Sequence, residues 1–508
     1  EKLQLAVAAA WPRFFQYKPG HGAFRKLDGK CDLYVYFYLL GLALVRPQGA
    51  FCFITSNSWL DVAYGADLQE FLLKHSHVKF LIDNEVKRSF AQADVNTVIA
   101  LLGPPDDCRQ DGLDKVARFV MFKKPFEEVA RAEVFKSIES VADRQSTDAY
   151  RVTARLQRDL VEEGLQTDTE QIGAEACAEA PEAPSARSTV RKQSPSTRPN
   201  KAAATSAKTP RYIGSQWGGK YLRAPDIFFT ILANPYMAPV TQVATARLGV
   251  TTGANEFFFV QKVGRGRYLT TLKGEETEIL LPDQFLRPVL RTASECVRFT
   301  FHAMDTNYHI LLVDRNCKNA QVSEYIRMAE KLGIHRRPFF NGRSHWYEIS
   351  NSICDRVALS EIIYRRYFFI WNADACVLNK NFYGFMSRIN EELLYALLNF
   401  TFSFLFFELS SRKPGAGASG IGVRVANRLP IVHPDFLNQR QRQIILEAAA
   451  SIRSRELVDI SVEVEQPDRR ELDKTLLAAL GFPERVMHEL YSSLLALVDK
   501  RVEKAKSV

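Results

Sequence analysis

Residues 32–74 read DLYVYFYLLGLALVRPQGAFCFITSNSWLDVAYGADLQEFLLK, and this stretch decides the fold class. The segment 31–46 is apolar on nearly every side and stops at Pro47, which predicts a buried helix. A β-rich run over residues 51–55 predicts a strand. Apolar side chains at helical spacing over residues 64–75 predict an amphipathic helix. The stretch therefore alternates helix and strand, which is the pattern of an α/β domain.

Three more strands extend this alternation. Residues 78–82 and 95–102 each predict a strand, and residues 116–122 predict a strand at the edge of the sheet. This order is typical of the back half of a doubly wound, Rossmann-like sheet. The leading strands of such a sheet, with the glycine-rich turn that binds a cofactor, would precede Glu1. We therefore expect residues 1–125 to form the C-terminal half of an α/β domain.

The rest of the chain divides by composition. Residues 162–211 are rich in Ala, Ser, Thr, Pro and charged residues, and they hold few large apolar side chains. Such a segment cannot bury enough surface to offset its chain entropy, so we expect a disordered linker, acidic first and basic later. Around it we expect a connecting helix over 126–161, a mixed α+β domain over 212–435 and a helical region over 436–508.

Positive charge is concentrated after the linker. The net charge is +9, and 27 Lys and Arg face 19 Asp and Glu between Arg211 and Asp435, a surplus of 8. A polyanionic partner such as nucleic acid fits this distribution. A generic basic protein fits it equally well, so the charge alone does not separate the two interpretations.

The cysteines and the hydropathy exclude other classes of protein. The eight cysteines are scattered singly with no CxxC pair, so we expect neither a zinc site nor a disulfide framework. Unpaired cysteines are typical of a reducing cytoplasm, where we place the chain. No stretch reaches about 18 uncharged apolar residues, so no membrane-spanning segment is predicted.

Several blocks of the sequence resemble a known family. Residues 32–74 and 78–102 resemble the region after the catalytic motif of adenine-N6 DNA methyltransferases of the single-chain restriction-modification (type IIG) class. The blocks occur in the family's order, and residues 469–507 resemble its C-terminal tail. Four further blocks resemble the target-recognition domain of these enzymes and of the related BREX-type phage-defence methyltransferases. They are LGVTTGANEFFFV (248–260), FLRPVL (285–290), HWYEI (345–349) and the glycine run after Arg412.

The resemblance implies a site-specific enzyme that uses S-adenosylmethionine to methylate adenine N6 in double-stranded DNA. The target base must leave the helical stack, because N6 inside a duplex cannot reach the methyl donor. The family's Asn-Pro-Pro-Tyr motif and its glycine-rich cofactor turn do not occur in these 508 residues. We therefore expect the catalytic motif and the main cofactor-binding motif upstream of Glu1, and we expect this chain to be inactive alone.

Two other hypotheses stay open beside the enzyme. The chain can be a DNA-recognition (specificity) module that tethers a separate catalytic or nuclease partner, or the remnant of an enzyme without activity. A nuclease domain upstream would make the whole a restriction-modification fusion, and the residues do not decide whether such a nuclease is fused or a separate subunit.

The resemblance places candidates for the wall of a target-base pocket in the first domain. Asp32 and Tyr34 open the helix that follows the missing motif, and Phe90 is the aromatic candidate for one face of the flipped base. Asn57 and Trp59 lie after the C-terminal end of a predicted strand, where doubly wound sheets bind ligands. The alternatives are a core role for Phe90 and simple loop packing for Asn57 and Trp59.

A short polar loop between apolar strands is the first candidate for DNA binding. Its hydroxyls and backbone N–H groups can approach a phosphate, and Asn255 can read an adenine edge. The alternative is a hairpin turn that needs positive φ at Gly253. The candidate residues of this loop are Thr251, Thr252, Gly253 and Asn255.

Arg343 and Trp346 form a second candidate for DNA binding. They combine a planar cation with a stacking surface, a pairing suited to nucleic acid. Trp346 as a core residue is the alternative.

The glycine run 415–420 is a third candidate. It satisfies the pattern GxGxxG but lacks a strand–turn–helix frame, so a dinucleotide site is not predicted. We interpret it as a loop for the DNA backbone, flanked by Arg412, Lys413 and Arg424. The tripeptide at residues 234–236, Asn-Pro-Tyr, lacks the second proline and is not interpreted as the catalytic motif.

Overall fold

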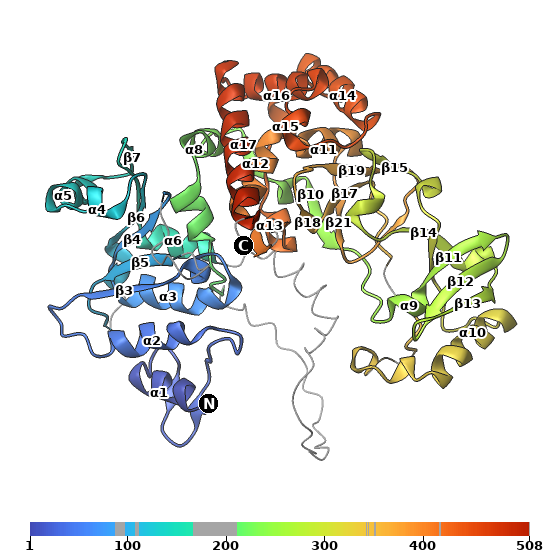
Figure 1. Ribbon diagram of the computed structural model, residues 1–508, viewed down its shortest axis with the longest axis horizontal. Coiled ribbons are helices and arrows are strands. Elements are labelled where there is room, and N and C mark those ends of the chain that lie inside the picture. The colour runs from blue at the N-terminus through green and yellow to red at the C-terminus, as the bar shows by residue number, and fades with distance from the viewer. Residues whose placement is uncertain are drawn as a thin grey trace.

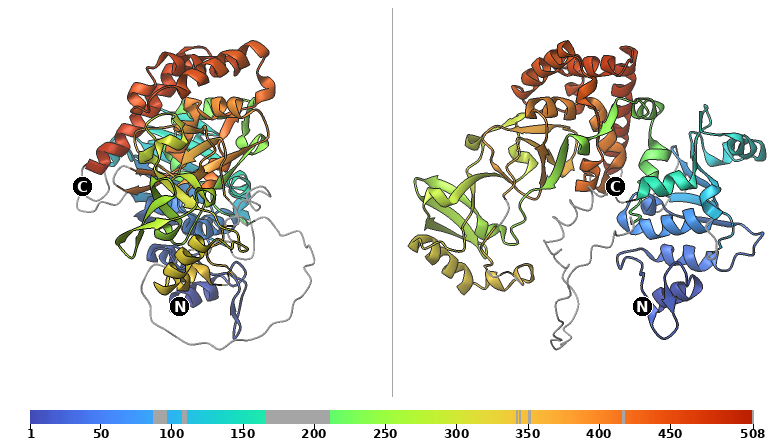
Figure 2. Two further views of the ribbon diagram at one scale, coloured as in Figure 1. Left: turned by 90° about the vertical axis from the view of Figure 1, so that its right-hand side faces the viewer. Right: turned by 180° about the vertical axis from the view of Figure 1, so that it is seen from behind.

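The computed structural model describes residues 1–86, 97–106, 111–165, 211–341, 343, 345–349, 352–415 and 418–506. These residues include three large mixed sheets, each with its own helices and core. The N-terminal sheet and the sheet beside α10 (Ala320–Lys331) lie at opposite ends of the molecule, with the C-terminal helices between them (Figures 1 and 2).

The first sheet is mixed rather than parallel throughout. Its strand order is β3 (Phe51–Ser56), β5 (Thr97–Leu102), β4 (Val78–Asn84), β6 (Val116–Phe122), β8 (Tyr150–Leu156) and β7 (Arg144–Ser146). β5 runs antiparallel between β3 and β4, and β4 and β6 are parallel. The four strands expected from the sequence are confirmed, but β6 is not the edge strand that we expected, because it lies between β4 and β8. The carboxyl ends of β3, β4 and β6 lie at one edge of the sheet.

Both helices expected near the first strand are present as α2 (Leu33–Leu42) and α3 (Ala66–His75). α3 is buried along most of its length. α2 buries Tyr38 but exposes 61% of Leu33 and 52% of Phe37. The expectation that this helix is buried on all sides is therefore wrong, because only one of its apolar faces packs against α1 (Lys2–Ala10) and β3.

The connecting helix expected over residues 126–161 is wrong beyond residue 140. The segment forms α4 (Phe126–Val129), α5 (Ala132–Ser140), the strands β7 and β8 and finally α6 (Gln157–Gly164). β8 pairs antiparallel with β6 and buries Val152 and Ala154. Pairing with β6 thus decides the structure of this segment, and it extends the first domain beyond residue 125.

Most of the linker expected over residues 162–211 lies outside the described residues, because 166–210 are not among them. Its first residues belong instead to α6, which ends at Gly164. Leu165 and Tyr212 form an antiparallel bridge. The chain before and after residues 166–210 therefore meets at one place in the fold.

The second domain begins later than residue 212. Trp217 and Tyr221 belong to the core of the first sheet, with ring centroids 5.7 Å and 4.7 Å from that of Phe119. Both aromatic residues lie in or beside the π-helix η4 (Gly218–Arg223). The expected boundary is corrected accordingly, since both rings belong to the apolar core of the first sheet.

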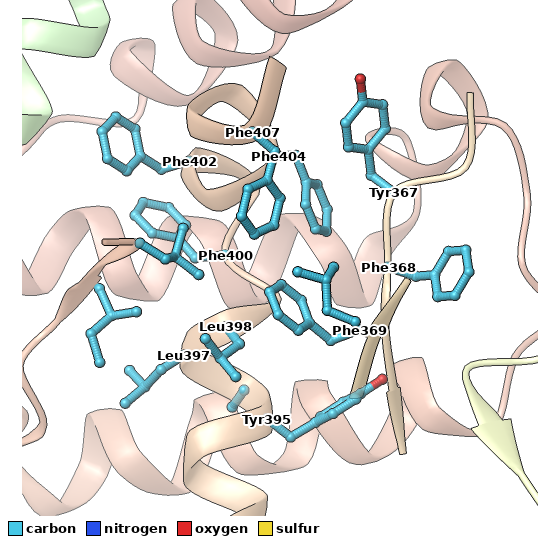
Figure 3. Close-up of a cluster of buried hydrophobic side chains, with 14 of the residues drawn as sticks. Tyr367, Phe368, Phe369, Tyr395, Leu397, Leu398, Phe400, Phe402, Phe404 and Phe407 are labelled. Atoms are coloured by element: carbon cyan, nitrogen blue, oxygen red, sulfur yellow. The ribbon is translucent and has the colours of Figure 1, made fainter. Parts of the chain in front are cut away.

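A five-stranded sheet lies at the centre of the molecule. Its order is β10 (Ala244–Leu248), β21 (Phe382–Ser387), β17 (Val357–Ser360), β19 (Phe369–Asn372) and β15 (Thr300–Phe301). Figure 3 shows part of its core, where the rings of Phe369, Phe402, Phe404 and Phe407 gather. The same core includes α8 (Asp226–Leu232), α11 (Glu391–Leu398), α12 (Thr401–Ser410), α14 (Gln439–Arg453), α16 (Pro467–Ala479) and α17 (Arg485–Lys506).

The helical region expected over 436–508 is therefore present but is not a separate element. Ile445, Leu476 and Leu494, from α14, α16 and α17, are fully buried in the core of the five-stranded sheet. The apolar faces of these helices are covered because they pack on this sheet.

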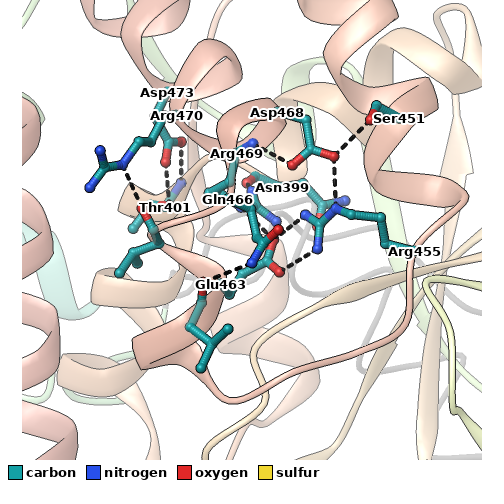
Figure 4. Close-up of polar contacts among 12 residues, drawn as sticks. Asn399, Thr401, Ser451, Arg455, Glu463, Gln466, Asp468, Arg469, Arg470 and Asp473 are labelled. Atoms are coloured by element: carbon teal, nitrogen blue, oxygen red, sulfur yellow. Dashed lines mark hydrogen bonds and ion pairs between the residues drawn. The ribbon is translucent and has the colours of Figure 1, made fainter.

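A buried polar network fixes the C-terminal helices on α12 (Figure 4). Arg469 is fully buried, and its Nε donates to Glu463 Oε1 at 2.9 Å while its guanidinium also donates to the Asn399 carbonyl. Asp473 accepts from the Thr401 backbone N–H at 2.9 Å. Each buried charge thus has a partner, which offsets its desolvation.

Two of the three segments that the sequence associates with DNA, the loop at 251–255 and the segment of Arg343 and Trp346, lie beside the third sheet. The mixed α+β structure expected over 212–435 is thus present, but as two sheets with separate cores. The order of the third sheet is β13 (Glu275–Leu280), β12 (Arg267–Leu272), β11 (Phe259–Gly264), β16 (Tyr308–Leu311), β14 (Leu286–Leu290) and β20 (Val377–Leu378), and it packs with α9 (Asn255–Phe258) and α10.

Among the described residues, no single helix has the length and apolar composition needed to cross a membrane. α11 and α12 meet that test only as a pair, and they are bent by 60° where they join. Most of their residues are buried in the core of the five-stranded sheet.

We predict that Leu494→Ala destabilises the five-stranded sheet together with the C-terminal helices. The leucine is fully buried in their common core, so the substitution should lower the free energy of unfolding by about 2–5 kcal/mol. Leu280→Ala is the matched control, because that side chain is 56% exposed and should cost only about 0.5 kcal/mol. Denaturant unfolding followed by tryptophan fluorescence measures both. Equal losses in the two variants would contradict the shared core.

Candidate active-site edge and nucleic-acid interface

Two polar segments meet at the carboxyl edge of the first sheet. β3 ends at Ser56 and continues into the 3-10 helix η1 (Asn57–Leu60), and β4 ends at Asp83 and Asn84. Because β3 and β4 point the same way, this edge brings Asn57 next to Asp83, and Asn57 Nδ2 donates to Asp83 Oδ2 at 3.3 Å. The bond orients the Asn57 amide, whose carbonyl oxygen is then a hydrogen-bond acceptor at the edge.

Asp32 and Tyr34 lie together with a tyrosine that the sequence analysis missed. The Tyr64 hydroxyl donates to Asp32 Oδ2 at 2.9 Å, and the hydroxyl oxygens of Tyr34 and Tyr64 are 2.7 Å apart. Burial and the hydrogen bond with Tyr64 raise the pKa of Tyr34, so its phenol stays protonated at neutral pH. Tyr64 lies in the 3-10 helix η2 (Ala63–Gly65), directly before α3. The sequence placed it at the start of the helix expected over residues 64–75, where only the apolar spacing was informative.

Serine hydroxyls connect these two groups. Ser56 Oγ and Ser58 Oγ are 2.9 Å apart, and Ser58 also hydrogen-bonds to Tyr64. A row of hydroxyl, amide and carboxylate groups therefore runs from Asp32 to Asp83 along the edge. Such a row offers both donors and acceptors, which is what the polar edge of a heterocyclic base requires.

Trp59 does not join this row. Its ring is fully buried, with ring centroids 5.5 Å from Tyr38 and 5.9 Å from Trp217, so the structure places it in the core beneath the edge. The position of Trp59 therefore agrees with the alternative interpretation, in which this residue only packs the loop. Phe90, the other aromatic candidate, lies outside the described residues.

An ion pair at the same edge joins the two halves of the chain. Arg223 Nη2 donates to Asp61 Oδ2 at 2.7 Å, and the Gly219 N–H donates to Asp61 Oδ1 at 3.1 Å. Arg223 also interacts electrostatically with Asp83. The sequence analysis missed this pair, and no local signal could have found it, because Asp61 and Arg223 are 162 positions apart.

The polar loop at residues 251–255 connects two sheets rather than the two strands of a hairpin. It leaves β10 in the central sheet and enters α9 and β11 of the third sheet. Gly253 has φ +73, as the turn alternative requires. Thr252 is buried and its Oγ1 donates to Asn255 Oδ1 at 2.5 Å, whereas Asn255 itself is exposed. Thr251 is half-buried.

Arg343 lies close to this loop, and Trp346 lies below it. The Arg343 guanidinium carbon is 4.6 Å from the centroid of Phe339, the ring that also packs on Gly253. Trp346 is only 8% exposed, and its Nε1 donates to Glu330 Oε1 at 3.0 Å. The core alternative therefore describes the position of Trp346, while Arg343 and the loop come together.

The glycine run after Arg412 forms two short strands. β22 (Arg412–Gly415) and β23 (Ala418–Gly420) pair with each other and with β18 (Ile362–Ile363). The backbone of Arg412 and Lys413 belongs to β22, and residues 416 and 417 lie outside the described residues. Arg424 is exposed on the helix α13 (Val423–Asn427) that follows. The strand pairing of this hairpin, among the residues that the structure describes, does not include the segment of Arg343.

Among the described residues there is neither a candidate metal site nor a disulfide bond. In the part of the chain that the structure describes, no group of three or more His, Cys, Asp or Glu could hold a metal ion. Six cysteines are described, and all six are free thiols.

We predict that Gly253→Ala destabilises the third sheet more than a glycine substitution at a comparable φ. An alanine Cβ at Gly253 would lie 2.0 Å from Phe339 Cδ1, and its φ of +73 is strained for any side chain. Gly274→Ala is the matched control, because its φ is +87 but nothing lies within 4 Å. The difference in unfolding free energy should be about 1–3 kcal/mol, the usual cost of overpacking. Equal costs would mean that Phe339 moves aside freely.

Comparisons with known proteins follow the same division of the chain. Residues 15–90 match the family model described as Eco57I restriction-modification methylase, which covers Asp32, Tyr34 and Asn57. Residues 221–467 match the model described as Type II methyltransferase M.Eco57I, C-terminal domain, which covers the loop at 251–255. No curated protein matches the chain.

One solved structure similar to this chain is that of the type IIG restriction endonuclease BpuSI. The identity is 12% and the TM-score 0.40, over 98% of this chain and 52% of that one, so the chain spans about half the length of BpuSI. This weak likeness adds nothing to the assignment, which depends on the two family models. Their matches, in this order along the sequence, show that this chain is similar to the Eco57I restriction-modification methylases in both of these parts.

Proposed function

We propose that this chain is part of a site-specific DNA methyltransferase of a restriction-modification or phage-defence system. The reaction transfers a methyl group from S-adenosylmethionine to adenine N6 in duplex DNA after base flipping. The observation that carries the proposal is the coincidence of the methylase match over residues 15–90 with the polar row at the carboxyl edge of the first sheet. Ligands of open α/β sheets bind at this edge.

The polar row supplies the groups that would hold a flipped adenine. The protonated phenols of Tyr34 and Tyr64 can donate or accept hydrogen bonds, and the Asn57 carbonyl oxygen can accept one from an amino group. Asp32 and Asp83 orient these groups by accepting hydrogen bonds from Tyr64 and Asn57. In this proposal Asp32, Tyr34 and Asn57 line one wall of the base pocket.

The methyl group itself is supplied by S-adenosylmethionine. The described residues include no glycine-rich turn between a strand and a helix, the structure expected to hold this cofactor. We therefore assign it no ligands among the described residues and derive no step through it.

The second and third sheets supply the contacts to DNA in this proposal. The surplus of 8 positive charges between Arg211 and Asp435 suits a polyanion. Thr251 and Asn255 belong to the loop on which Phe339 packs, and Arg343 stacks on that ring. Arg424 is exposed on α13, which follows the glycine hairpin that contains Arg412 and Lys413. A nuclease domain or subunit would be a further partner.

We predict that the full chain binds duplex DNA and that added salt weakens the binding steeply. Each phosphate that is neutralised contributes about −0.9 to the slope of log K against log salt. Fluorescence anisotropy with a labelled duplex from 50 to 300 mM NaCl measures the slope, and a labelled neutral polymer of similar length is the control. Undetectable binding, or binding independent of salt, would contradict the DNA-binding half of the proposal.

A DNA-recognition module without catalysis is the second candidate function. The observation in its favour is that the 508 residues contain no Asn-Pro-Pro-Tyr. The coding sequence upstream of Glu1 separates the two: the tetrapeptide within a few tens of codons supports the enzyme, and its absence supports the recognition module.

We predict that residues 1–508 transfer no methyl group on their own. The groups in the polar row can bind a base, but the motif that the family resemblance assigns to catalysis does not occur in the sequence. Incorporation of label from S-adenosyl-[methyl-³H]methionine into duplex DNA measures transfer, with an active adenine methyltransferase as positive control. Transfer above background would show that catalytic residues lie within these 508 residues.

A further inference from the structure

One segment of the third domain, between Glu330 and Glu348, concentrates positive charge. Residues 331–347 hold Lys331, Arg336, Arg337 and Arg343 but no Asp or Glu. Within it, Arg337 has a structural partner, because it forms an ion pair with Glu256 and its Nη1 donates to the Gly253 carbonyl at 3.2 Å. The segment is thus attached to the polar loop at 251–255 by one of its own cations.

The Phe339 ring makes a second contact with the polar loop and also contacts a second cation, Arg343. Phe339 packs on Gly253 so closely that a Cβ there would lie 2.0 Å from the ring. On the same ring lies the Arg343 guanidinium, 4.6 Å from the centroid. We call Gly253, Asn255, Phe339 and Arg343, with the neighbouring Arg336, the basic platform.

The cations of the basic platform are available to a ligand. Within the described part of the chain, neither Arg343 nor Arg336 is paired with a carboxylate, and Arg336 is exposed. Partial burial lowers the pKa of Arg343, but an arginine remains charged at neutral pH after such a shift. Stacking on Phe339 already orders the guanidinium, so less side-chain entropy is lost when it binds an anion.

The polar loop contributes a further donor. Thr252 Oγ1 donates to Asn255 Oδ1 at 2.5 Å, which orients the amide of this exposed residue. The Asn255 Nδ2 group and the two guanidinium groups are all hydrogen-bond donors. Phosphate oxygens accept hydrogen bonds from such donors.

We propose that the basic platform binds backbone phosphates of duplex DNA. This inference depends on the proposed DNA-binding function and specifies which contact the platform makes. The two guanidinium groups and the Asn255 amide group can all donate hydrogen bonds to phosphate oxygens. In this inference the platform sets the position of DNA on the third domain.

The test compares variants of the full chain on two duplexes of unrelated sequence. Arg343→Ala should reduce the slope of log K against log salt by about 1, because one phosphate contact is lost. That slope change corresponds to about 8-fold weaker binding at 0.1 M relative to 1 M salt. Arg336→Ala should act in the same direction, and both effects should be equal on the two duplexes.

Two further variants separate charge from packing. Arg343→Lys keeps the cation and should restore most of the slope. Arg470→Ala is the control, because Arg470 is a half-buried arginine of α16 that is already paired with Glu465, and its loss should leave the slope unchanged. Circular dichroism confirms that each variant is folded.

The outcomes distinguish the inference from the function on which it depends. If the unmodified chain binds DNA but Arg343→Ala and Arg336→Ala bind with unchanged affinity and slope, the platform is not a phosphate site. A loss confined to one duplex would show base readout and would also overturn the inference. Failure of the unmodified chain to bind either duplex would instead remove the DNA-binding function itself.

Discussion

The rest of this structure depends on the burial of one apolar sheet face. The five-stranded sheet from β10 to β15 is covered by α11 and α12, and by the C-terminal helices α14, α16 and α17, in a single core. Removing any of these helices would expose aromatic and aliphatic side chains to water, at a cost of about 25 cal/mol per Å². The buried pair between Arg469 and Glu463 adds direction to this packing, since its charges are satisfied in only one arrangement of α15 (Ile460–Glu463) and α16. The loops that extend from this sheet therefore start from fixed positions.

A belt of polar and aromatic contacts attaches this central unit to the first sheet. Trp217 and Tyr221 are buried in the first core, Arg223 pairs with Asp61 at the polar edge, and Arg144 pairs with Asp226 at the start of α8. At the other end of the chain, Lys500 of α17 lies 2.9 Å from Glu85, directly after β4. The C-terminal helix and η4 thus both touch the region around the polar edge. Exposed pairs such as Lys500–Glu85 contribute little stability, so the buried rings account for most of the attachment.

The two functional surfaces have different physical characters. The polar edge from Asp32 to Asp83 mixes donors and acceptors, held by hydrogen bonds among Tyr34, Tyr64 and Asn57. The basic platform presents donors and positive charge only. A flipped base requires the first kind of surface and a phosphate backbone the second. In the proposed methyltransferase they would act on the same DNA molecule, the platform by holding the duplex and the edge by receiving one of its bases.

The sequence by itself determined the local elements. The apolar runs and helical spacings gave β3, β4, β5 and β6 with α2 and α3, and the order of the family blocks agreed with both family matches. It also brought Asp32, Tyr34 and Asn57 into consideration, because they stand at the ends of predicted elements. Only the tertiary structure decided the direction of β5, the strand β8 where a helix was expected, the burial of Trp59 and Trp346, and the pairing of Arg223 with Asp61. The physical reason is that periodicity reports which face of an element is apolar, whereas the partner that covers this face comes from a distant part of the chain and leaves no local signal.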